Sequence, residues 1–497
     1  MYYSKNPLTN EVYQIPEEIN DKQKIDRFLA LNKGKSVVVI QGLGFVGSVM
    51  SLVCANSKVK EYAVIGVDLA TESNYWKICA LNSGTFPLSS SDEKVYKFYE
   101  NARTQGNFYA TYDPYAYEVA DIIIVDINLD VEKKSDEENN LSSFDVNLED
   151  FKSAVKTIAD RCKEEILVLV ETTVPPGACM KIVKPILESG LKDRNMSIEK
   201  YYLGHSYERV MPGPDYIDSI KNFFRVYSGI DDRSADAVED FLHTIISTSE
   251  YPLTRLGSTN ATEIAKVLEN SYRAMNIAFV VEWSRFAEEA NVNLYEIVEA
   301  IRLRPTHKNL MFPGIGVGGY CLTKDPLLAS WSRMNIFNSN ESLSQSEKAV
   351  EINDKMPLYA FLFILENVDI DIHSKKILLL GVSYRGDVGD TRFTPVGPLY
   401  DKLVKNDCDV CLHDPFISHW DEKGVSVYTQ LDSVIENEFD MIIICANHSL
   451  YRDNNVIRII NEMKAPIIID TIGLLSESQI NSLSFEHKVK VLGRGDL

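Results

Sequence analysis

The chain has 497 residues and a formal net charge of −21, with 51 Lys and Arg against 72 Asp and Glu. Its 45% hydrophobic and 25% charged residues are typical of a globular protein of several domains and exclude global disorder. The acidic balance argues against a nucleic-acid partner, because nucleic-acid binding needs a basic face.

Eight cysteines are too sparse for a disulfide scaffold, and the only CxxC, at Cys408–Cys411, lacks the further ligands of a zinc site. We therefore predict no metal centre. The first residues lack the apolar stretch of a signal peptide, and no uncharged apolar run reaches the length of about 18 residues that a membrane helix needs. We expect a soluble, cytoplasmic protein with no membrane partner.

Residues 1–35 form a polar N-terminal extension. Short apolar, β-branched runs follow it, and polar or helix-period stretches separate them. They lie at 36–40, 63–67, 122–125 and 166–170. This alternation predicts buried strands joined by helices in a parallel sheet. An acidic, Asn-rich stretch within 129–150 predicts a surface loop.

The segment Gly42-Leu-Gly44-Phe45-Val46-Gly47 lies between the first strand and an apolar helix. Glycines of an ordinary tight turn would look similar, but here the motif precedes a helix whose N–H groups can hold a pyrophosphate. The second strand ends at Asp68, 21 residues beyond Gly47, the spacing of a carboxylate that binds the adenosine ribose. No basic residue directly follows Asp68, which favours NAD over NADP.

Between Asn260 and Glu289 there is no Gly or Pro, and apolar residues recur at helical spacing. This predicts one long helix, with Asn260 and Glu263 as a capping pair at its start. Lys266 and Asn270 lie one turn apart on it and offer a proton-carrying group and an oxyanion donor. A solvated charged stripe is the alternative explanation.

Four glycines occur between 314 and 319, and Cys321, Lys324 and Asp325 follow them. Glycine lets a backbone approach a ligand closely, and a cysteine in a polar turn near a cation is a candidate thiolate nucleophile. The alternative is a buried structural thiol, as most cysteines are.

From Lys375 a second series of apolar strands begins. The fold class is therefore α/β, with two Rossmann-like doubly wound domains joined by a central long-helix region. We place the N-terminal extension at 1–35, the first sheet domain at 36–250, the central helical domain at 251–370 and the second sheet domain at 371–497.

Six motifs, in order, resemble those of the nucleotide-sugar 6-dehydrogenase family, the UDP-glucose and UDP-N-acetylhexosamine dehydrogenases. The resemblance covers residues 36–475. The motifs are GLGFVG at 42–47, ETTVPPG at 171–177, YERVMPG at 207–213, the helix with Lys266 and Asn270, GVGGYCLTKDP at 316–326 and GDTRFTPV at 389–396.

The resemblance implies a four-electron oxidation of the C6 alcohol of a nucleotide-linked sugar to the acid, with two NAD⁺ and one water consumed. Cys321 would form a thiohemiacetal with the aldehyde and then a thioester. It also implies that 36–250 binds NAD, that 251–370 carries the catalytic cysteine turn and that 371–497 binds the UDP-sugar.

The resemblance also assigns roles to individual residues. Lys266 and Asp325 would handle water and protons, Asn270 would contact the oxyanion, and Glu208 would transfer a proton at the thioester step. Thr173, Lys324 and Arg392 would lie at NAD or the water near it. The substrate contacts would be Glu208, Arg209, Val210, Lys266, Asn270, Arg304, Leu310, Met311, Phe312, Pro313, Gly314, Gly318 and Arg385.

Family members form a dimer through the long helix, so a homodimer is expected, with Arg302 or Arg304 reaching the partner's site. ERVMPG and GVGGYC resemble the N-acetylhexosamine branch, which favours UDP-N-acetylglucosamine or UDP-N-acetylmannosamine over UDP-glucose. The family's role in making polysaccharide precursors suggests the same pathway here. Asp126–Asp130 stands where the family has a Val-Pro-Thr-Pro-like stretch, so the Thr that helps to hold the cofactor has no counterpart.

Two alternatives remain. A single-step hydroxyacid dehydrogenase uses the lysine helix but needs no cysteine, so the segment around Cys321 argues against it. A non-catalytic paralogue that binds a nucleotide-sugar or NAD would explain the altered Val125–Leu129 stretch. Against loss of catalysis stand the retained residues Cys321, Lys266, Asn270 and Asp325.

Overall fold

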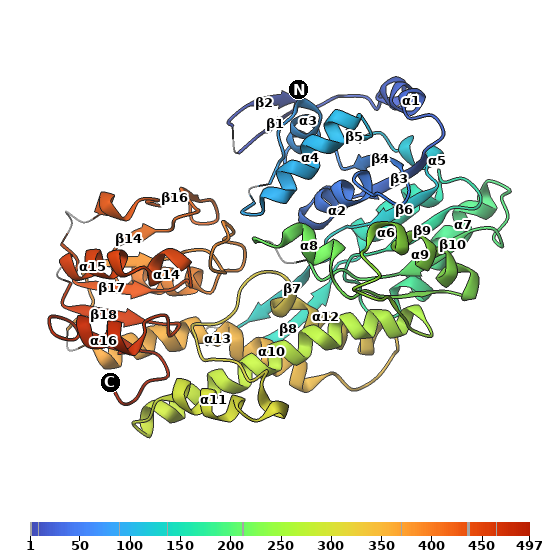
Figure 1. Cartoon of the computed structure of the whole chain (residues 1–497). Coiled ribbons are helices and arrows are strands. Elements are labelled where there is room, and N and C mark those ends of the chain that lie inside the picture. Colours follow the sequence, from blue (N-terminus) through green and yellow to red (C-terminus); the bar gives the residue numbers. More distant parts are fainter. Residues whose placement is uncertain are drawn as a thin grey trace. The chain divides into compact units, whose positions relative to one another are not determined.

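The computed structural model describes residues 2–7, 9–88, 90–136, 138–210, 213–368, 370–434, 438–463 and 465–497. The chain divides into two compact units. The first consists of Met1–Glu132, Asp145–Val267 and Trp331–Glu341, and the second of Lys133–Phe144, Leu268–Ser330 and Ser342–Leu497. Each unit is built around a sheet of mainly parallel strands (Figure 1).

The sheet of the first unit has eight strands in the order β12-β11-β10-β9-β6-β3-β4-β5, all parallel to their neighbours except β10 and β11. The four strands predicted from apolar runs are all present. Every residue of β4, β6 and β9 is buried, as expected for strands covered on both faces. The bounds are β3 (Ser36–Gln41), β4 (Tyr62–Val67), β5 (Phe108–Thr111), β6 (Ile122–Val125), β9 (Leu167–Val170), β10 (Tyr202–His205), β11 (Val226–Gly229) and β12 (Thr254–Arg255).

Helices cover this sheet, and α2 is the most deeply buried of them, because its sequence is apolar nearly all round. A π-helical turn, η1 (Cys179–Val183), leads into α7. The helices are α1 (Lys22–Leu31), α2 (Phe45–Ala55), α3 (Tyr75–Ser83), α4 (Glu93–Gln105), α5 (Ala116–Val119), α6 (Glu149–Ala159), α7 (Lys184–Asp193), α8 (Tyr216–Lys221) and α9 (Asp232–Ile245).

The polar N-terminal extension is ordered. It forms a hairpin of β1 (Tyr3–Lys5) and β2 (Val12–Gln14), followed by α1. The buried Asp21 carboxylate accepts hydrogen bonds from the hydroxyls of Tyr109 and Thr111, both on β5. These buried bonds attach the extension to the edge of the first sheet.

The prediction of a loop within 129–150 is wrong for two segments. β7 (Val131–Ser135) and β8 (Leu141–Val146) pair as a two-stranded sheet. Within the second unit, the charged side chain of Lys133 on β7 forms an ion pair with Asp354 at 2.6 Å. The acidic, Asn-rich composition of this segment indicated a loop. The ion-pair partner Asp354 lies more than 200 residues away in the sequence and could not be anticipated from it.

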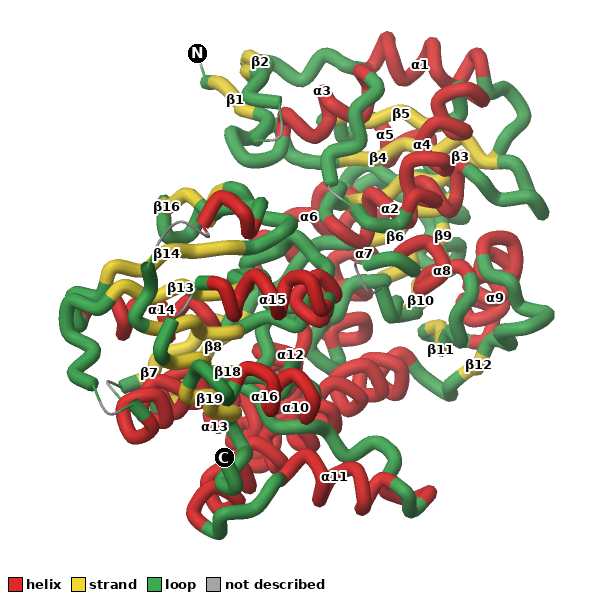
Figure 2. Tube along the Cα trace, turned by 60° about the vertical axis from the view of Figure 1, so that its left-hand side comes forward, coloured by secondary structure: helices red, strands yellow, loops and turns green. Residues whose placement is uncertain are grey.

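The second unit has a five-stranded parallel sheet in the order β14-β13-β17-β18-β19 (Figure 2). Along β13, Ile377 and Leu379 enter one hydrophobic core while Leu378 and Leu380 enter another, since side chains alternate between the faces. The elements are β13 (Lys376–Leu380), β14 (Asp409–His413), β17 (Met441–Ile444), β18 (Ile467–Asp470), β19 (Lys488–Val491), α13 (Ser344–Asn367), α14 (Val396–Lys405), α15 (Asn454–Glu462) and α16 (Glu477–Leu483).

The predicted long helix is present as α10 (Thr259–Glu289), and α11 (Leu294–Arg302) and α12 (Cys321–Asn335) follow it. The predicted capping pair is wrong, since Asn260 already lies inside the helix and Glu263 bonds elsewhere. Among the residues that the structure describes, no helix is long and apolar enough to cross a membrane.

Candidate active site

In the turn after β3, two of the three glycines lie close against neighbouring backbone atoms. Gly42 has φ +100°, and a Cβ there would lie 2.4 Å from the Asp126 carbonyl oxygen. A Cβ at Gly47 would lie 1.9 Å from the Gly42 carbonyl oxygen, whereas one at Gly44 would meet nothing within 4 Å. Packing therefore demands the first and third glycines, while the second leaves open the space into which a ligand's phosphates fit.

Asp68 follows β4 and is tied to the same turn. Its Oδ2 accepts the backbone N–H of Leu43 at 3.0 Å, and its Oδ1 accepts that of Leu69 at 2.7 Å. Burial raises the pKa of this carboxyl, while Lys77 and the two N–H groups oppose the rise. The turn, the start of α2 at Phe45 and Val46, and Asp68 together form the cradle expected for a dinucleotide.

Lys266 and Glu208, each predicted as a catalytic residue, lie together in the first unit. The Lys266 Nζ donates to the Glu208 carbonyl oxygen at 2.7 Å and lies 3.8 Å from Glu208 Oε1. It also lies 5.4 Å from the centroid of the Tyr207 ring. Both charged residues are buried, so this pair is an ammonium–carboxylate couple shielded from water.

The first unit also holds three more of the predicted site residues, Thr173, Arg209 and Val210. Thr173 is buried in the loop after β9. Arg209 donates to the Phe224 carbonyl oxygen at 2.6 Å and stacks on Tyr207, and Val210 N–H donates to Glu208 Oε2 at 2.5 Å. The segment 207–210 is therefore held by its own contacts and by Lys266. Residues 211 and 212 of the same motif lie outside the described residues.

Glu263, one turn before Lys266, joins α10 to the loop after β9. Its two carboxylate oxygens accept the backbone N–H groups of Gly177 and Cys179 at 2.6 and 2.8 Å. The side chain is fully buried, and burial raises its pKa to about 7 against the lowering effect of these bonds. The sequence predicted Glu263 only as a capping residue, and its actual partners follow from the tertiary fold.

Cys321 is the first residue of α12, in the second unit. All eight cysteines are described, and Cys321 alone among them is exposed. Burial raises the pKa of each of the other seven thiols. A helix N-terminus favours an anion, so Cys321 has the setting of a reactive thiolate.

The side chains that follow Cys321 form a buried polar group. Asn270 Nδ2 donates to Asp325 Oδ2 at 2.6 Å, and Lys324 Nζ lies 3.7 Å from Asp325 Oδ1. All three residues are buried. The bond between Asn270 and Asp325 lies within the second unit and was not predicted from the sequence, while Lys266, one turn earlier on α10, belongs to the first unit.

The segment Gly389–Val396 supports the cysteine turn. The Gly319 N–H donates to the Arg392 carbonyl oxygen at 3.2 Å, and a Cβ at Gly318 would lie 2.5 Å from the Phe393 carbonyl oxygen. Tyr320 lies between the Arg392 guanidinium, 4.7 Å from its ring centroid, and the Phe393 ring at 5.0 Å. Arg392 also bonds Asp390 through Nε at 2.8 Å.

The remaining predicted substrate residues lie in the second unit. Arg385 and Arg304 are exposed, whereas Pro313 and Gly318 are buried. Phe312 stacks on Tyr295 with centroids 5.9 Å apart, and Arg302 lies 4.9 Å from its ring. Leu310, Met311 and Gly314 are half-buried beside them.

Asp414, which the sequence did not indicate, organises the loop that bears Arg385. Its Oδ2 accepts the N–H groups of Val382 and Ser383, each at 2.9 Å, and lies 3.1 Å from His448 Nε2. The sequence feature that could have indicated Asp414 is its position directly after an apolar strand, because parallel sheets bind ligands at the carboxyl edge.

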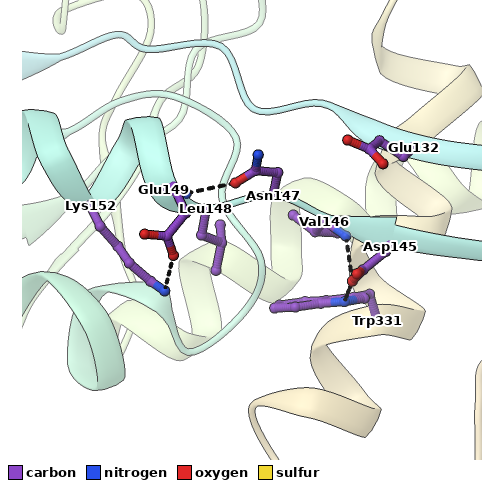
Figure 3. Close-up of a pocket in the computed structure, with 8 residues that line it drawn as sticks. All are labelled: Glu132, Asp145, Val146, Asn147, Leu148, Glu149, Lys152 and Trp331. Carbon is purple, nitrogen blue, oxygen red and sulfur yellow. Dashed lines mark hydrogen bonds and ion pairs between the residues drawn. The ribbon is translucent and has the colours of Figure 1, made fainter.

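Two pockets differ in their relation to these residues. One of about 270 Å³ in the second unit is lined by Val317, Thr323 and Phe393, beside the cysteine turn. Another of about 390 Å³ in the first unit lies between β8, α6 and Trp331 and contains none of the predicted residues (Figure 3). Its polar groups pair with one another, as in the 2.7 Å bond from the Trp331 indole to Asp145. Among the described residues, no cluster of three His, Cys, Asp or Glu side chains is suited to a metal.

Three sequence models of one family match successive parts of the chain. They describe the NAD binding domain, the central domain and the UDP binding domain of the UDP-glucose/GDP-mannose dehydrogenase family, and match residues 36–246, 260–355 and 378–477.

Among similar curated proteins is the UDP-N-acetyl-D-mannosamine dehydrogenase of Methanocaldococcus jannaschii, 29% identical over 93% of this chain and 97% of that protein. That of Pyrococcus horikoshii is 28% identical over 93% of this chain and its full length. The solved structure of the UDP-D-ManNAc dehydrogenase from Pyrococcus horikoshii aligns with a TM-score of 0.76 at 25% identity, covering 93% of this chain and 100% of that one. These similarities, together with the glycine cradle, identify the first unit as the site of NAD binding.

The different surroundings of the three glycines predict different effects of substitution. Gly44→Ala should fold normally, with a Tm within about 2 °C of the wild type, but weaken NADH binding by at least about tenfold, since its methyl group enters the phosphate space. Gly47→Ala should instead lower Tm by about 5 °C or more, because its Cβ overlaps the Gly42 carbonyl. Thermal unfolding and NADH titration distinguish the two, and equal behaviour of both variants would contradict this account.

Proposed function

Because the chain belongs to the UDP-glucose/GDP-mannose dehydrogenase family, we propose that it oxidises the C6 hydroxyl of a UDP-N-acetylhexosamine to the carboxylate. It is an NAD-dependent oxidoreductase of nucleotide-sugars. The observation that carries the proposal is Cys321, the exposed cysteine at the N-terminus of α12, beside the buried Lys324, Asp325 and Asn270.

Bound NAD⁺ would supply the hydride acceptor for each of the two oxidation steps. In the proposed sequence the C6 alcohol loses a hydride and its hydroxyl proton to give the aldehyde. The Cys321 thiolate adds to the aldehyde carbon, which yields a thiohemiacetal after the oxygen takes up a proton. Loss of a second hydride and of that proton gives a thioester, and attack by water releases the carboxylate and restores the thiolate.

Each buried group has a role in this scheme that suits its surroundings. Lys266, near Glu208, supplies a positive charge for the developing oxyanion, and Glu208 exchanges a proton at the thioester step. Asp325 and Lys266 handle the hydrolytic water, and the Asn270 amide contacts the substrate oxygen. Thr173, Lys324 and Arg392 contact NAD or the adjacent water, and Arg385 contacts the substrate's phosphates.

We further propose UDP-N-acetylmannosamine as the first substrate to test, with UDP-N-acetylglucosamine next. The named relatives act on the former, and the ERVMPG and GVGGYC motifs resemble the same branch.

The proposed domain division is 36–250 for NAD, 251–370 for the cysteine turn and 371–497 for the UDP-sugar. A catalytic free thiol suits the reducing cytoplasm, and the acid product suits polysaccharide precursor synthesis.

The proposal predicts two NADH per UDP-sugar consumed, measured by NADH absorbance across a panel of UDP-sugars. Cys321→Ser should lower the rate of acid formation by at least about a thousandfold, because the thioester cannot form. Cys411→Ser, at a half-buried thiol on β14, is the matched control and should retain activity. One NADH per sugar, unaffected by Cys321→Ser, would instead establish a single-step alcohol dehydrogenase.

We propose a homodimer formed through α10. Five large side chains on the part of α10 in the second unit are between 46% and 62% exposed and recur at helical spacing: Leu268, Tyr272, Phe279, Trp283 and Phe286. The rings of Phe279, Trp283 and Phe286 touch one another in sequence. A continuous exposed apolar stripe of this kind fits burial against a second copy, with Arg302 or Arg304 extending toward the partner's site.

The double variant Phe279→Glu, Trp283→Glu should therefore be monomeric where the wild type is dimeric, since two charges would be buried in an apolar contact. Phe485→Glu is the matched control, because Phe485 is 89% exposed but lies outside α10. Light scattering coupled to size-exclusion chromatography gives the masses. A monomeric wild type, or a dimer that survives the double substitution, would contradict the proposed interface.

A further inference from the structure

A pair of buried carboxyl groups lies at the carboxyl edge of the first sheet. Asp126 directly follows β6 and Glu171 directly follows β9. These strands are parallel neighbours in which Val125 pairs with Val170, so the two acidic residues are also in register. Asp126 is 9% exposed and Glu171 is fully buried.

The cation bonded to this pair of residues is Arg225. The buried Arg225 guanidinium donates to Glu171 Oε1. Within the described part of the chain, no donor reaches either carboxylate oxygen of Asp126 or the second oxygen of Glu171. The next acid, Glu208, already has Lys266 as its cation. Two carboxylates and one guanidinium would leave an uncompensated buried negative charge, which is costly unless one acid keeps its proton.

The acidic groups around Asp126 act in the same sense as its burial. Burial, Glu171 and Glu208 raise the pKa of Asp126 well above its usual range, and Arg225 only partly offsets them. The effect extends to Cys54 on α2, where burial, Glu171 and Asp126 raise the pKa of the thiol. Burial also raises the pKa of Glu171, but Arg225 opposes that rise through its charge and its hydrogen bond. A protonated Asp126 can therefore donate to a Glu171 carboxylate that Arg225 stabilises, and this arrangement leaves the cluster neutral.

Asp126 also touches the glycine turn. Its N–H donates to the Gln41 carbonyl at 2.8 Å, and its carbonyl oxygen closes over Gly42, where a Cβ would lie 2.4 Å away. β3 and β6 are the strands between which the chain order of the sheet reverses, and such a crevice is where a dinucleotide binds. The negative pyrophosphate is therefore expected close to the Asp126–Glu171 pair.

We propose that Asp126 is a cofactor-binding determinant of this chain: it stays protonated, donates to Glu171, and thereby keeps a second negative charge away from the pyrophosphate of NAD. It occupies the first position of the segment that departs from the family's Val-Pro-Thr-Pro-like stretch. The proposal rests on NAD binding and not on the identity of the sugar.

The sign of the resulting pH dependence follows from linkage. The pyrophosphate favours the neutral pair, so NADH affinity is highest while Asp126 holds its proton. The affinity falls as pH rises through the raised pKa of Asp126 in the free protein. A variant with only one ionisable group at the pair has no such proton to lose.

The test is NADH affinity, measured by nicotinamide fluorescence without sugar, from about pH 6 to about pH 10. Wild-type affinity should fall by at least about tenfold over this range. Asp126→Asn and Glu171→Gln should each reduce that fall to less than about twofold. The single carboxylate that remains, Glu171 in the first variant and Asp126 in the second, can then pair with Arg225. The exposed Asp130, changed to Asn, is the matched control and should keep the wild-type profile.

Identical pH profiles for the wild type and Asp126→Asn would overturn the proposal. If Asp126→Asn fails to fold, as judged by circular dichroism, Glu171→Gln makes the same measurement from the other carboxyl group, and a wild-type profile in that variant overturns it equally. Since no sugar is present, failure here is independent of whether Cys321 forms a thioester.

Discussion

The parallel pairing of β3 with β4 and β6 determines where the chemistry of the first unit can lie. Parallel strands bring all their carboxyl ends to one edge, so Gly42, Asp68, Asp126 and Glu171 emerge together although they span 130 residues of sequence. The same constraint in the second sheet brings Asp414 to the loop that follows β13. The order of the strands in the sheet, and not proximity in the sequence, thus brings together the residues suited to binding a dinucleotide or a diphosphate.

Burial at these edges makes charge compensation the second requirement. Lys266 with Glu208, and Lys324 and Asn270 with Asp325, are buried polar groups with partners in their own unit. In a low-dielectric setting such partners fix both the orientation and the protonation of a side chain. The exposed Cys321 stands in contrast: its position at the N-terminus of α12 leaves it accessible and favours a thiolate, as the proposed nucleophile requires.

Local sequence predicted those features whose physical cause is local. Continuous apolar runs gave the buried strands, the absence of Gly and Pro gave α10, and the spacing of Gly42, Gly44 and Gly47 gave the dinucleotide turn. The contacts of Glu263 and the closeness of Asp126 to Glu171 escaped prediction, because the partners lie more than 40 residues apart in the sequence. The hairpin of β7 and β8 escaped prediction because its strands are rich in polar and charged residues, a composition that indicates a loop. The roles of Cys321 and Lys266 came from their resemblance to family motifs, since spacing alone left a structural thiol and a solvated stripe as alternatives.

The central claim is that Cys321 carries the sugar as a thioester between the second oxidation and hydrolysis. The most direct measurement is peptide mass spectrometry of enzyme quenched with acid during turnover with NAD⁺ and UDP-N-acetylmannosamine. The account predicts that the peptide containing Cys321 gains the mass of the UDP-linked acyl group, while the peptides with the other seven cysteines are unchanged. Formation of the acid without any adduct at Cys321, or with the adduct on another cysteine, would contradict it.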